Sequence, residues 1–508
     1  MDGIAICRVA FGKFSRMVKG YYQQTFKIMI DQIFKLLFQF LESIFGFVFE
    51  FFEVLISGIP IKNKKYSAEF APVSTLFSRS YHGFCLTGRK NLSVKHSYQN
   101  ALIIGGTGVG KSSVVLIPSL YAMKSSFIVH DPSGELFVKS GAFLKQRGYV
   151  VKLLNFANPA VSSGYNPLER AHGSSDIQKI ALLLIENSIG KGKDPFWNTQ
   201  AVALLAMLIS VLKKQEKEYQ NLFNVRHLLN QLGANSSAID DLFSRFADEK
   251  LFSEYKSFIA YDDKVVNGVI ATSKAALQIF NDDSVAQVTS FDTLNFQDFR
   301  DWPVALFIQN SVADQKYYSV LTSLLFEQFF SFLLGRFPND NEQDIFLLID
   351  EASSLNLPTL PLAVANVRKH RAGIMILVQD FAQVVHHYGR YDADAIKSNC
   401  FAKMYFTGQS LETTKELEAT LGKFEYEDDK GHKVVRSLMT NDEIRTLKST
   451  RALLICGHHH PIMARLRPYY KNSTYRNYSL LPIPHLQSDL QSDAVPLLPL
   501  NQPVHSDE

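Results

Sequence analysis

A glycine-rich loop between an apolar strand and a helix constrains this chain more than any other stretch. Residues 101–118 read ALIIGGTGVGKSSVVLIP, and Gly105, Gly110, Lys111 and Ser112 fill the pattern G-x-x-x-x-G-K-[ST]. Glycines let backbone N–H groups turn inward around phosphate oxygens, and the helix that follows offers its positive end. The stretch therefore predicts a phosphate-binding loop.

The same loop predicts ATP and Mg²⁺ as ligands. We expect Lys111 to reach the β and γ phosphates and the Ser112 hydroxyl to ligate Mg²⁺. The candidate nucleotide-binding residues are Gly105, Gly106, Thr107, Gly108, Val109, Gly110, Lys111, Ser112 and Ser113.

Length and composition indicate a globular protein of two or three domains. The chain has 508 residues, of which 46% are apolar and 20% charged, and its net charge of +4 is too small to prove a polyanionic partner. Its four cysteines lack metal-ligand spacing, which fits a reducing cytoplasm. Three consecutive histidines, His458 to His460, cannot all face one metal ion.

Strand and helix signals alternate around the loop, which predicts an α/β fold with a parallel sheet covered on both faces. We expect strands at 101–104, 127–130, 149–154, 304–309, 345–349, 374–378, 452–456 and 462–466. Asp131 follows the second of these, at the end of a strand where such sheets place ligands.

From about Ala171 to Phe291 the pattern is helical throughout. Apolar residues recur at three- and four-residue spacing in 177–188, 197–212, 222–232, 238–256 and 265–280. These segments predict an inserted all-α domain.

Two adjacent carboxylates end the apolar strand 345–349. Asp350 is expected to hold the Mg²⁺ shell and Glu351 to polarise the attacking water. The alternative is a pair of solvated acids at a strand end. Gln379, after the strand 374–378, suits γ-phosphate sensing or the orientation of water. Between them, the basic cluster Arg368 to Arg371 is either an arginine finger for a neighbouring subunit, through Arg368 or Arg371, or a solvated loop.

The N-terminal segment is unusually apolar. Eight phenylalanines lie between Phe34 and Phe52, and polar or small residues recur every three or four positions from Gln32 to Ser57, so one narrow polar stripe runs along a long helix. Charged residues interrupt every 20-residue window, and basic residues flank both sides. We favour a helix in the inner-leaflet interface; a helix packed on protein and a true span remain alternatives.

The end of the chain is rich in Pro, Ser, Gln and Asn. This composition predicts a disordered tail that could dock a substrate or adaptor. The expected organisation is a membrane-associated helix (1–65), a nucleotide-binding domain in two parts (66–170 and 296–471), the inserted all-α domain (171–295) and the tail (472–508).

The whole arrangement resembles the TraG/TraD type IV coupling proteins of conjugation and type IV secretion. The resemblance covers about Phe77 to Lys471. The motifs that carry it are GGTGVGKSSVVLIPSL, DPSGEL, YNPL, TSFDTLNFQDF, LLIDEASSL, LVQDFAQVVHHYG and SLMTNDEIRTL. Three features depart from the family: Ser133 stands where Lys is usual, one striped segment replaces two membrane spans, and the charged run 425–433 is a local elaboration.

This resemblance implies a RecA-like ATPase with an inserted all-α domain, assembled as a hexameric ring with ATP between subunits. It implies partners as well: relaxase-bound single-stranded DNA or protein effectors, the type IV secretion channel and inner-membrane lipids. The expected location is the cytoplasmic face of the bacterial inner membrane.

Two other functions stay open. One is a receptor platform for protein effectors in which ATP controls assembly. The other is a double-stranded DNA translocase of the FtsK/HerA kind.

Overall fold

The computed structural model describes residues 66–190, 195–310, 313–490 and 494–500. The predicted N-terminal helix lies outside these residues. Residues 66–67 and 425–434 belong to one unit, and the rest of the described chain belongs to a second.

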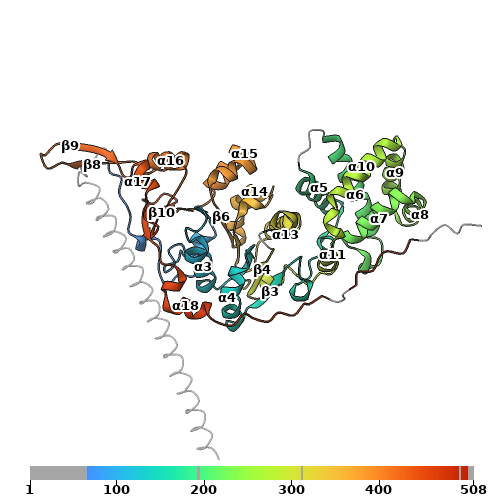
Figure 1. Cartoon of the computed structure of the whole chain (residues 1–508), viewed down its shortest axis with the longest axis horizontal. Coiled ribbons are helices and arrows are strands. Elements are labelled where there is room, and N and C mark those ends of the chain that lie inside the picture. The colour runs from blue at the N-terminus through green and yellow to red at the C-terminus, as the bar shows by residue number, and fades with distance from the viewer. Residues whose placement is uncertain (1–65, 191–194, 311–312, 491–493, 501–508) are drawn as a thin grey trace, which may run out of the picture. The chain divides into compact units, whose positions relative to one another are not determined.

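The second unit contains a large, mostly parallel sheet (Figure 1). Within the described residues it has nine strands in the order β11-β10-β7-β1-β6-β5-β2-β4-β3. The strands are β1 Ala101–Ile104, β2 Ser126–His130, β3 Val150–Leu154, β4 Val304–Ile308, β5 Ile345–Ile349, β6 Ala372–Val378, β7 Ala402–Tyr405, β10 Arg451–Cys456 and β11 Ile462–Arg465. Neighbours from β3 to β7 pair in parallel, and β10 and β11 add antiparallel pairs at the edge.

Helices bury both faces of this sheet. Leu102 and Ile104 of β1 belong to one buried cluster, and Ala101 and Ile103 belong to another, because successive side chains of a strand point to opposite faces. The first face is covered by α13 Gln315–Gly335, α14 Leu360–Asn366 and α15 Phe381–Ser398, and the second by α3 Ile117–Ala122 and α4 Glu135–Gln146 (Figure 1). Burial on both sides explains the continuous apolar runs in the strand sequences.

Between β3 and β4 the chain forms a group of helices, as the sequence predicted. They are α5 Ser174–Ile189, α6 Pro195–Leu212, α7 Leu222–Ala234, α8 Ser236–Phe246, α9 Glu249–Ile259, α10 Asp263–Ala276 and α11 Asp283–Ser290. Helix α6 lies at the centre, against α5, α7, α9 and α10. The single helix predicted over 238–256 is wrong, because the Asp248 side chain accepts the Leu251 N–H and caps a new helix there.

Two described helices, α6 and α13, are long and apolar enough to cross a membrane by length and composition. However, 67% of the apolar window of α13 is buried inside the fold. Its phenylalanines and leucines cover the sheet, so α13 serves as a core helix here.

The remaining helices are short: α2 Val94–Ser97, α12 Asp298–Asp301, α16 Leu411–Leu421, α17 Asn441–Arg445 and α18 Ser473–Ser479. The tail was predicted to be disordered from residue 472, but its residues 473–479 form α18. Tyr475 and Tyr478 of α18 pack on Tyr121 and Phe143, with the Phe143 and Tyr478 rings 4.2 Å apart. Aromatic contacts order the segment despite its polar composition.

The charged run after Phe424 forms a hairpin, β8 Lys423–Glu427 and β9 Lys433–Ser437. The Asp428 carboxylate accepts the N–H groups of Lys430 and His432, which closes the turn.

Candidate active site

The glycine-rich loop leaves the carboxyl end of β1, as predicted. Gly108 and Gly110 have φ angles of +76° and +97°, which side chains of L-residues rarely adopt. Gly105 lies so close to Phe406 that an added Cβ would come within 2.8 Å of the Phe406 Cβ. The next residues, Ser112–Leu116, form a π-helical turn that continues into α3. Glycine is therefore required for the shape of this loop.

Lys111 folds back over the loop. Its Nζ donates to the carbonyl oxygens of Gly105 and, at 3.0 Å, Gly106. Burial lowers the pKa of Lys111, while the nearby charges of Asp350 and Glu351 raise it. A phosphate would offer this ammonium charged acceptors in place of two neutral carbonyls, so the loop fits such a ligand.

Three adjacent strands bring the glycine-rich loop, Asp350 and Gln379 to one edge of the sheet. Strand β6 lies between β1 and β5, all three are parallel, and the Gly105 N–H donates to the Val378 carbonyl oxygen at 3.2 Å. Gln379 follows β6 and Asp350 follows β5. Ligands of open parallel sheets bind at this carboxyl edge, so the loop, Asp350 and Gln379 form one candidate site.

Acidic side chains crowd this edge. Burial, helped by the charges of Glu351 and Asp131 and opposed by that of Lys111, raises the pKa of Asp350 to about 7. Crowded carboxylates with one ammonium fit a divalent cation. No group of three or more His, Cys, Asp or Glu side chains in the described parts of the chain could hold a metal. Mg²⁺ would therefore need the Ser112 hydroxyl and phosphate oxygens as further ligands.

Glu351 stands in a strained turn. Its φ of +52° is left-handed, which costs a non-glycine residue roughly 1–3 kcal/mol. The Ser354 N–H and hydroxyl donate to the Glu351 carbonyl oxygen at 2.9 and 2.8 Å. On the other side, His130 Nδ1 lies 2.6 Å from the Asp350 carbonyl oxygen. His130 is absent from the predicted site residues, because one histidine in an apolar strand gives no functional signal.

Asp131 lies just before helix α4. Its carboxylate accepts the N–H groups of Leu136 and Phe137, at 3.2 and 2.8 Å, at the start of α4. Burial raises its pKa to about 6. Asp131 therefore caps α4 and adds negative charge beside Asp350.

The basic cluster lies at the start of β6, the opposite end of that strand from Gln379. Arg371 is one of the two predicted candidates for an arginine finger, and its guanidinium makes hydrogen bonds within its own chain. Its Nε bonds Asp344 Oδ1 at 2.9 Å, while Nη1 and Nη2 donate to the carbonyl oxygens of Asn339, Asp340 and Glu342. These bonds tie the loop before β5 to β6, which leaves the exposed Arg368 as the candidate.

A sequence comparison shows which family the chain belongs to. The sequence model of the family described as type IV secretory system conjugative DNA transfer matches residues 61–492. The chain belongs to this family. Membership confirms the predicted relation to the type IV coupling proteins.

Known relatives of this conjugative DNA transfer family are distant. The conjugal transfer protein TraG of Escherichia coli is 22% identical over 354 residues, which are 64% of this chain and 55% of TraG. The type IV secretion system-coupling protein VirD4 of Bartonella henselae is 21% identical over 344 residues, 64% of this chain and 53% of VirD4. The chain thus spans about half the length of these relatives.

Solved structures confirm the predicted fold class for this family member. The conjugative coupling protein TrwB, in a sulphate complex, superposes with a TM-score of 0.64 at 17% identity, covering 85% of this chain and 97% of TrwB. TrwB with ADP and Mg²⁺ gives 0.63 at 18% identity, covering 79% and 94%.

Ser133 is the departure from the family pattern that lies nearest the site. Its side chain is exposed, and its hydroxyl accepts the Glu135 N–H at 3.3 Å. It supplies no positive charge where family members usually carry lysine.

Proposed function

We propose that this chain is a P-loop ATPase that couples ATP hydrolysis to the delivery of relaxase-bound single-stranded DNA to a type IV secretion channel. The observation that carries the proposal is the meeting of the glycine-rich loop, Gln379 and the Asp350–Glu351 pair on three adjacent strands. Lys111 lies near enough to both acids for their charges to oppose the lowering of its pKa by burial.

Each residue has a separate role in the proposal. Residues 105–113 bind the phosphates through backbone N–H groups, and the Lys111 ammonium neutralises charge on the γ-phosphate. Ser112 and Asp350 hold Mg²⁺, which supplies charge neutralisation when bound. Glu351 accepts a proton from the attacking water, and Gln379 orients that water.

ATP between subunits of a homo-hexameric ring completes the site in this proposal. Arg368 then supplies its guanidinium to the γ-phosphate of the neighbouring subunit. Two observations support this role: the Arg368 side chain is exposed, and the ion pair to Asp344 is made by Arg371. The N-terminal segment holds the ring on the inner-membrane lipids at their cytoplasmic face.

The nucleotide is supported by the solved relatives. TrwB has been solved with ADP and Mg²⁺ and with non-hydrolysable analogues of ATP and GTP. At 17–18% identity, these structures show only that the fold is shared. ATP and Mg²⁺ as ligands of this chain are part of the proposal.

ATP turnover with single-stranded DNA, with duplex DNA and without DNA tests this function. We expect single-stranded DNA to raise turnover most, with an effect that weakens as salt increases, because phosphate contacts carry such binding. Stimulation by duplex alone would instead favour an FtsK/HerA-like double-strand translocase.

A receptor platform for protein effectors is the second candidate, favoured by the all-α domain inserted between β3 and β4. That function predicts cargo binding that survives Glu351→Gln and turnover that DNA leaves unchanged. Stimulation by single-stranded DNA, lost in Glu351→Gln, would exclude a purely assembling role for ATP.

A further inference from the structure

The C-terminal segment 494–500 lies on helix α7 of the all-α domain. Asn224, whose side chain is fully buried, holds its backbone at two points. Asn224 Nδ2 donates to the Pro496 carbonyl oxygen at 3.0 Å, and Asn224 Oδ1 accepts the Leu498 N–H at 2.8 Å. The side-chain amide thus bonds the N–H and the carbonyl oxygen of an extended backbone, as a neighbouring strand would.

Leu498 is the buried apolar anchor of the same segment, and the partly buried Leu500 packs against the same core cluster. Leu498 is 5% exposed and belongs to the core cluster that contains the apolar residues of α7, whereas the adjacent Leu497 is 49% exposed. Pro496 and Pro499 flank this pair, and proline limits the conformations of a free chain, which lowers the entropy cost of binding. The main features recognised are therefore an extended backbone and the buried Leu498, with a smaller contact from Leu500.

A second attachment lies upstream, beside β3. Asp489 Oδ2 accepts Lys152 Nζ at 3.1 Å and the Ser163 hydroxyl at 3.2 Å, and Asp489 Oδ1 accepts the Thr293 hydroxyl at 2.7 Å. The neighbouring Ser488 N–H donates to the Ala160 carbonyl oxygen at 3.1 Å. The C-terminal segment is thus fixed to the sheet at one point and to α7 at another (Figure 1).

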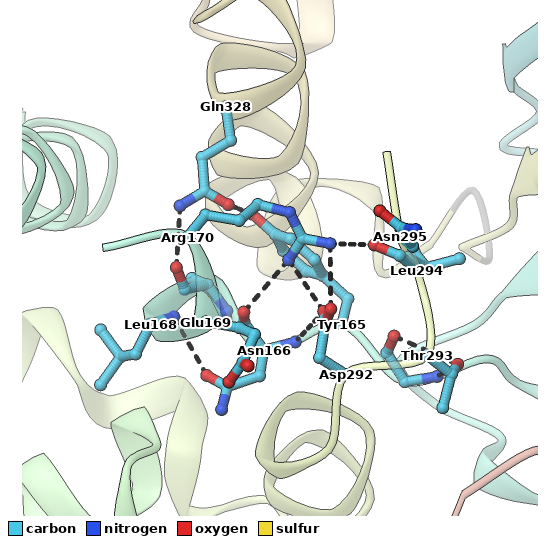
Figure 2. Close-up of polar contacts among 12 residues, drawn as sticks. Tyr165, Asn166, Leu168, Glu169, Arg170, Asp292, Thr293, Leu294, Asn295 and Gln328 are labelled. Carbon is cyan, nitrogen blue, oxygen red and sulfur yellow. Dashed lines mark hydrogen bonds and ion pairs between the residues drawn. The ribbon is translucent and has the colours of Figure 1, made fainter. Parts of the chain in front are cut away.

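The connections that enter and leave the all-α domain meet at this upstream attachment. Arg170 lies on the connection that enters the domain, and Asp292 lies on the connection that leaves it. Figure 2 shows the two hydrogen bonds from Arg170 to Asp292, Nη1 to Oδ1 at 2.8 Å and Nη2 to Oδ2 at 3.1 Å. Gln328 of α13 bonds the Tyr165 hydroxyl and the Pro167 carbonyl oxygen. The two connections between the sheet and the all-α domain are therefore stabilised by their own contacts. The C-terminal segment is not needed to hold these connections together.

We propose that the surface of α7 around Asn224 is a binding site for an extended peptide rich in proline and leucine. Residues 496–498 of this chain occupy it and act as a releasable strap between the sheet and the all-α domain. The site recognises a leucine side chain together with the backbone N–H and the carbonyl oxygen two residues earlier. A partner that carries such a peptide competes with the strap for the same site.

Hydrogen exchange on the full chain tests the strap, with two adjacent leucines as a matched pair. In the wild type we expect the Leu498 amide to exchange at least about tenfold more slowly than in the free peptide. Leu498→Ser should remove this protection and speed exchange at the start of α7, whereas Leu497→Ser should leave both unchanged. Asn224→Ala should act like Leu498→Ser on residues 496–498.

A second experiment, with an added peptide, tests whether the site on α7 can bind residues 494–500 as a separate molecule. A synthetic peptide of residues 494–500, at about millimolar concentration to match a short tether, should restore protection of α7 in the full-length Leu498→Ser chain. The same peptide with serine for Leu498 should not restore it.

Three results would overturn the proposal. The first is free-peptide exchange at Leu498 in the wild type, and the second is equal behaviour of the Leu497 and Leu498 variants. The third is unfolding of the whole all-α domain in Leu498→Ser, since the segment would then be part of the domain core and not a bound peptide.

Discussion

The ring nitrogen Nδ1 of His130 lies 2.6 Å from the backbone carbonyl oxygen of Asp350. A carbonyl oxygen accepts hydrogen bonds, so Nδ1 carries the proton and donates it. His130 is fully buried on β2, and Asp350 follows the neighbouring β5. The bond therefore fixes the last peptide before Glu351 turns into its left-handed conformation. His130 is a positioning residue for that turn.

We predict that His130→Ala lowers kcat for ATP about tenfold or more and leaves KM nearly unchanged, because a misplaced base loses proton-transfer efficiency. His130→Asn, which retains a short N–H donor, should recover part of the loss. Steady-state kinetics of both variants with Mg²⁺ and ATP check this. Equal kcat values for His130→Ala and the wild type would contradict the positioning role.

Lys111→Ala is predicted to abolish nucleotide binding and leave the fold intact. A ligand that binds the folded chain at 100 times its Kd stabilises it by about 2.7 kcal/mol. Thermal unfolding with and without Mg²⁺ and ATP should show that gain for the wild type and none for Lys111→Ala. Removal of Mg²⁺ with EDTA should reduce the wild-type gain, since Asp350 and Ser112 would lose their shared cation. An unchanged gain in Lys111→Ala would place the nucleotide elsewhere.

Local sequence patterns predicted the parts of the fold and site that depend on neighbouring residues. The glycine-rich loop and the acids after β5 were recognisable, because glycine spacing and an apolar strand ending in carboxylates are local signals. Strand β7 was missed, since the four residues AKMY carry too short a pattern.

Contacts distant in sequence explain the errors. The hydrogen-bond partners of Arg371 could not be predicted, because its acceptors, including Asp344, lie 27 or more positions away and show no pattern. The tail was taken for disordered because its composition is polar, yet Tyr478 packs on Phe143 and Leu498 is buried on α7. Composition cannot reveal a few well-placed apolar contacts.

The two arginines of the basic cluster should behave differently. Arg371→Ala removes several hydrogen bonds to backbone carbonyls and an ion pair to Asp344, so we expect a loss of about 2 kcal/mol in the free energy of unfolding. Arg368→Ala, at an exposed position, should keep stability within about 0.5 kcal/mol while lowering ATP turnover of the assembled ring. Urea denaturation and turnover measured on both variants separate these effects. A stable Arg371→Ala with reduced turnover would reverse the two roles.

Arg170→Lys is predicted to weaken the junction between the sheet and the all-α domain. The Arg170 side chain is 16% exposed and bonds both oxygens of Asp292, a geometry that a lysine ammonium cannot reproduce. We expect a loss of about 1–3 kcal/mol in urea denaturation. Lys179→Ala, on the exposed face of α5, is the control and should change little. Equal stability of the two variants would contradict a stabilising role for the Arg170–Asp292 pair.

The most direct test of the ATPase assignment is turnover by Glu351→Gln in the presence of single-stranded DNA. The substitution keeps the size of the side chain and removes the base. We predict Mg²⁺- and ATP-binding equal to the wild type, with hydrolysis slowed about 100-fold or more. Hydrolysis by Glu351→Gln at the wild-type rate would contradict the account, because the strained turn after Asp350 would then have no catalytic purpose.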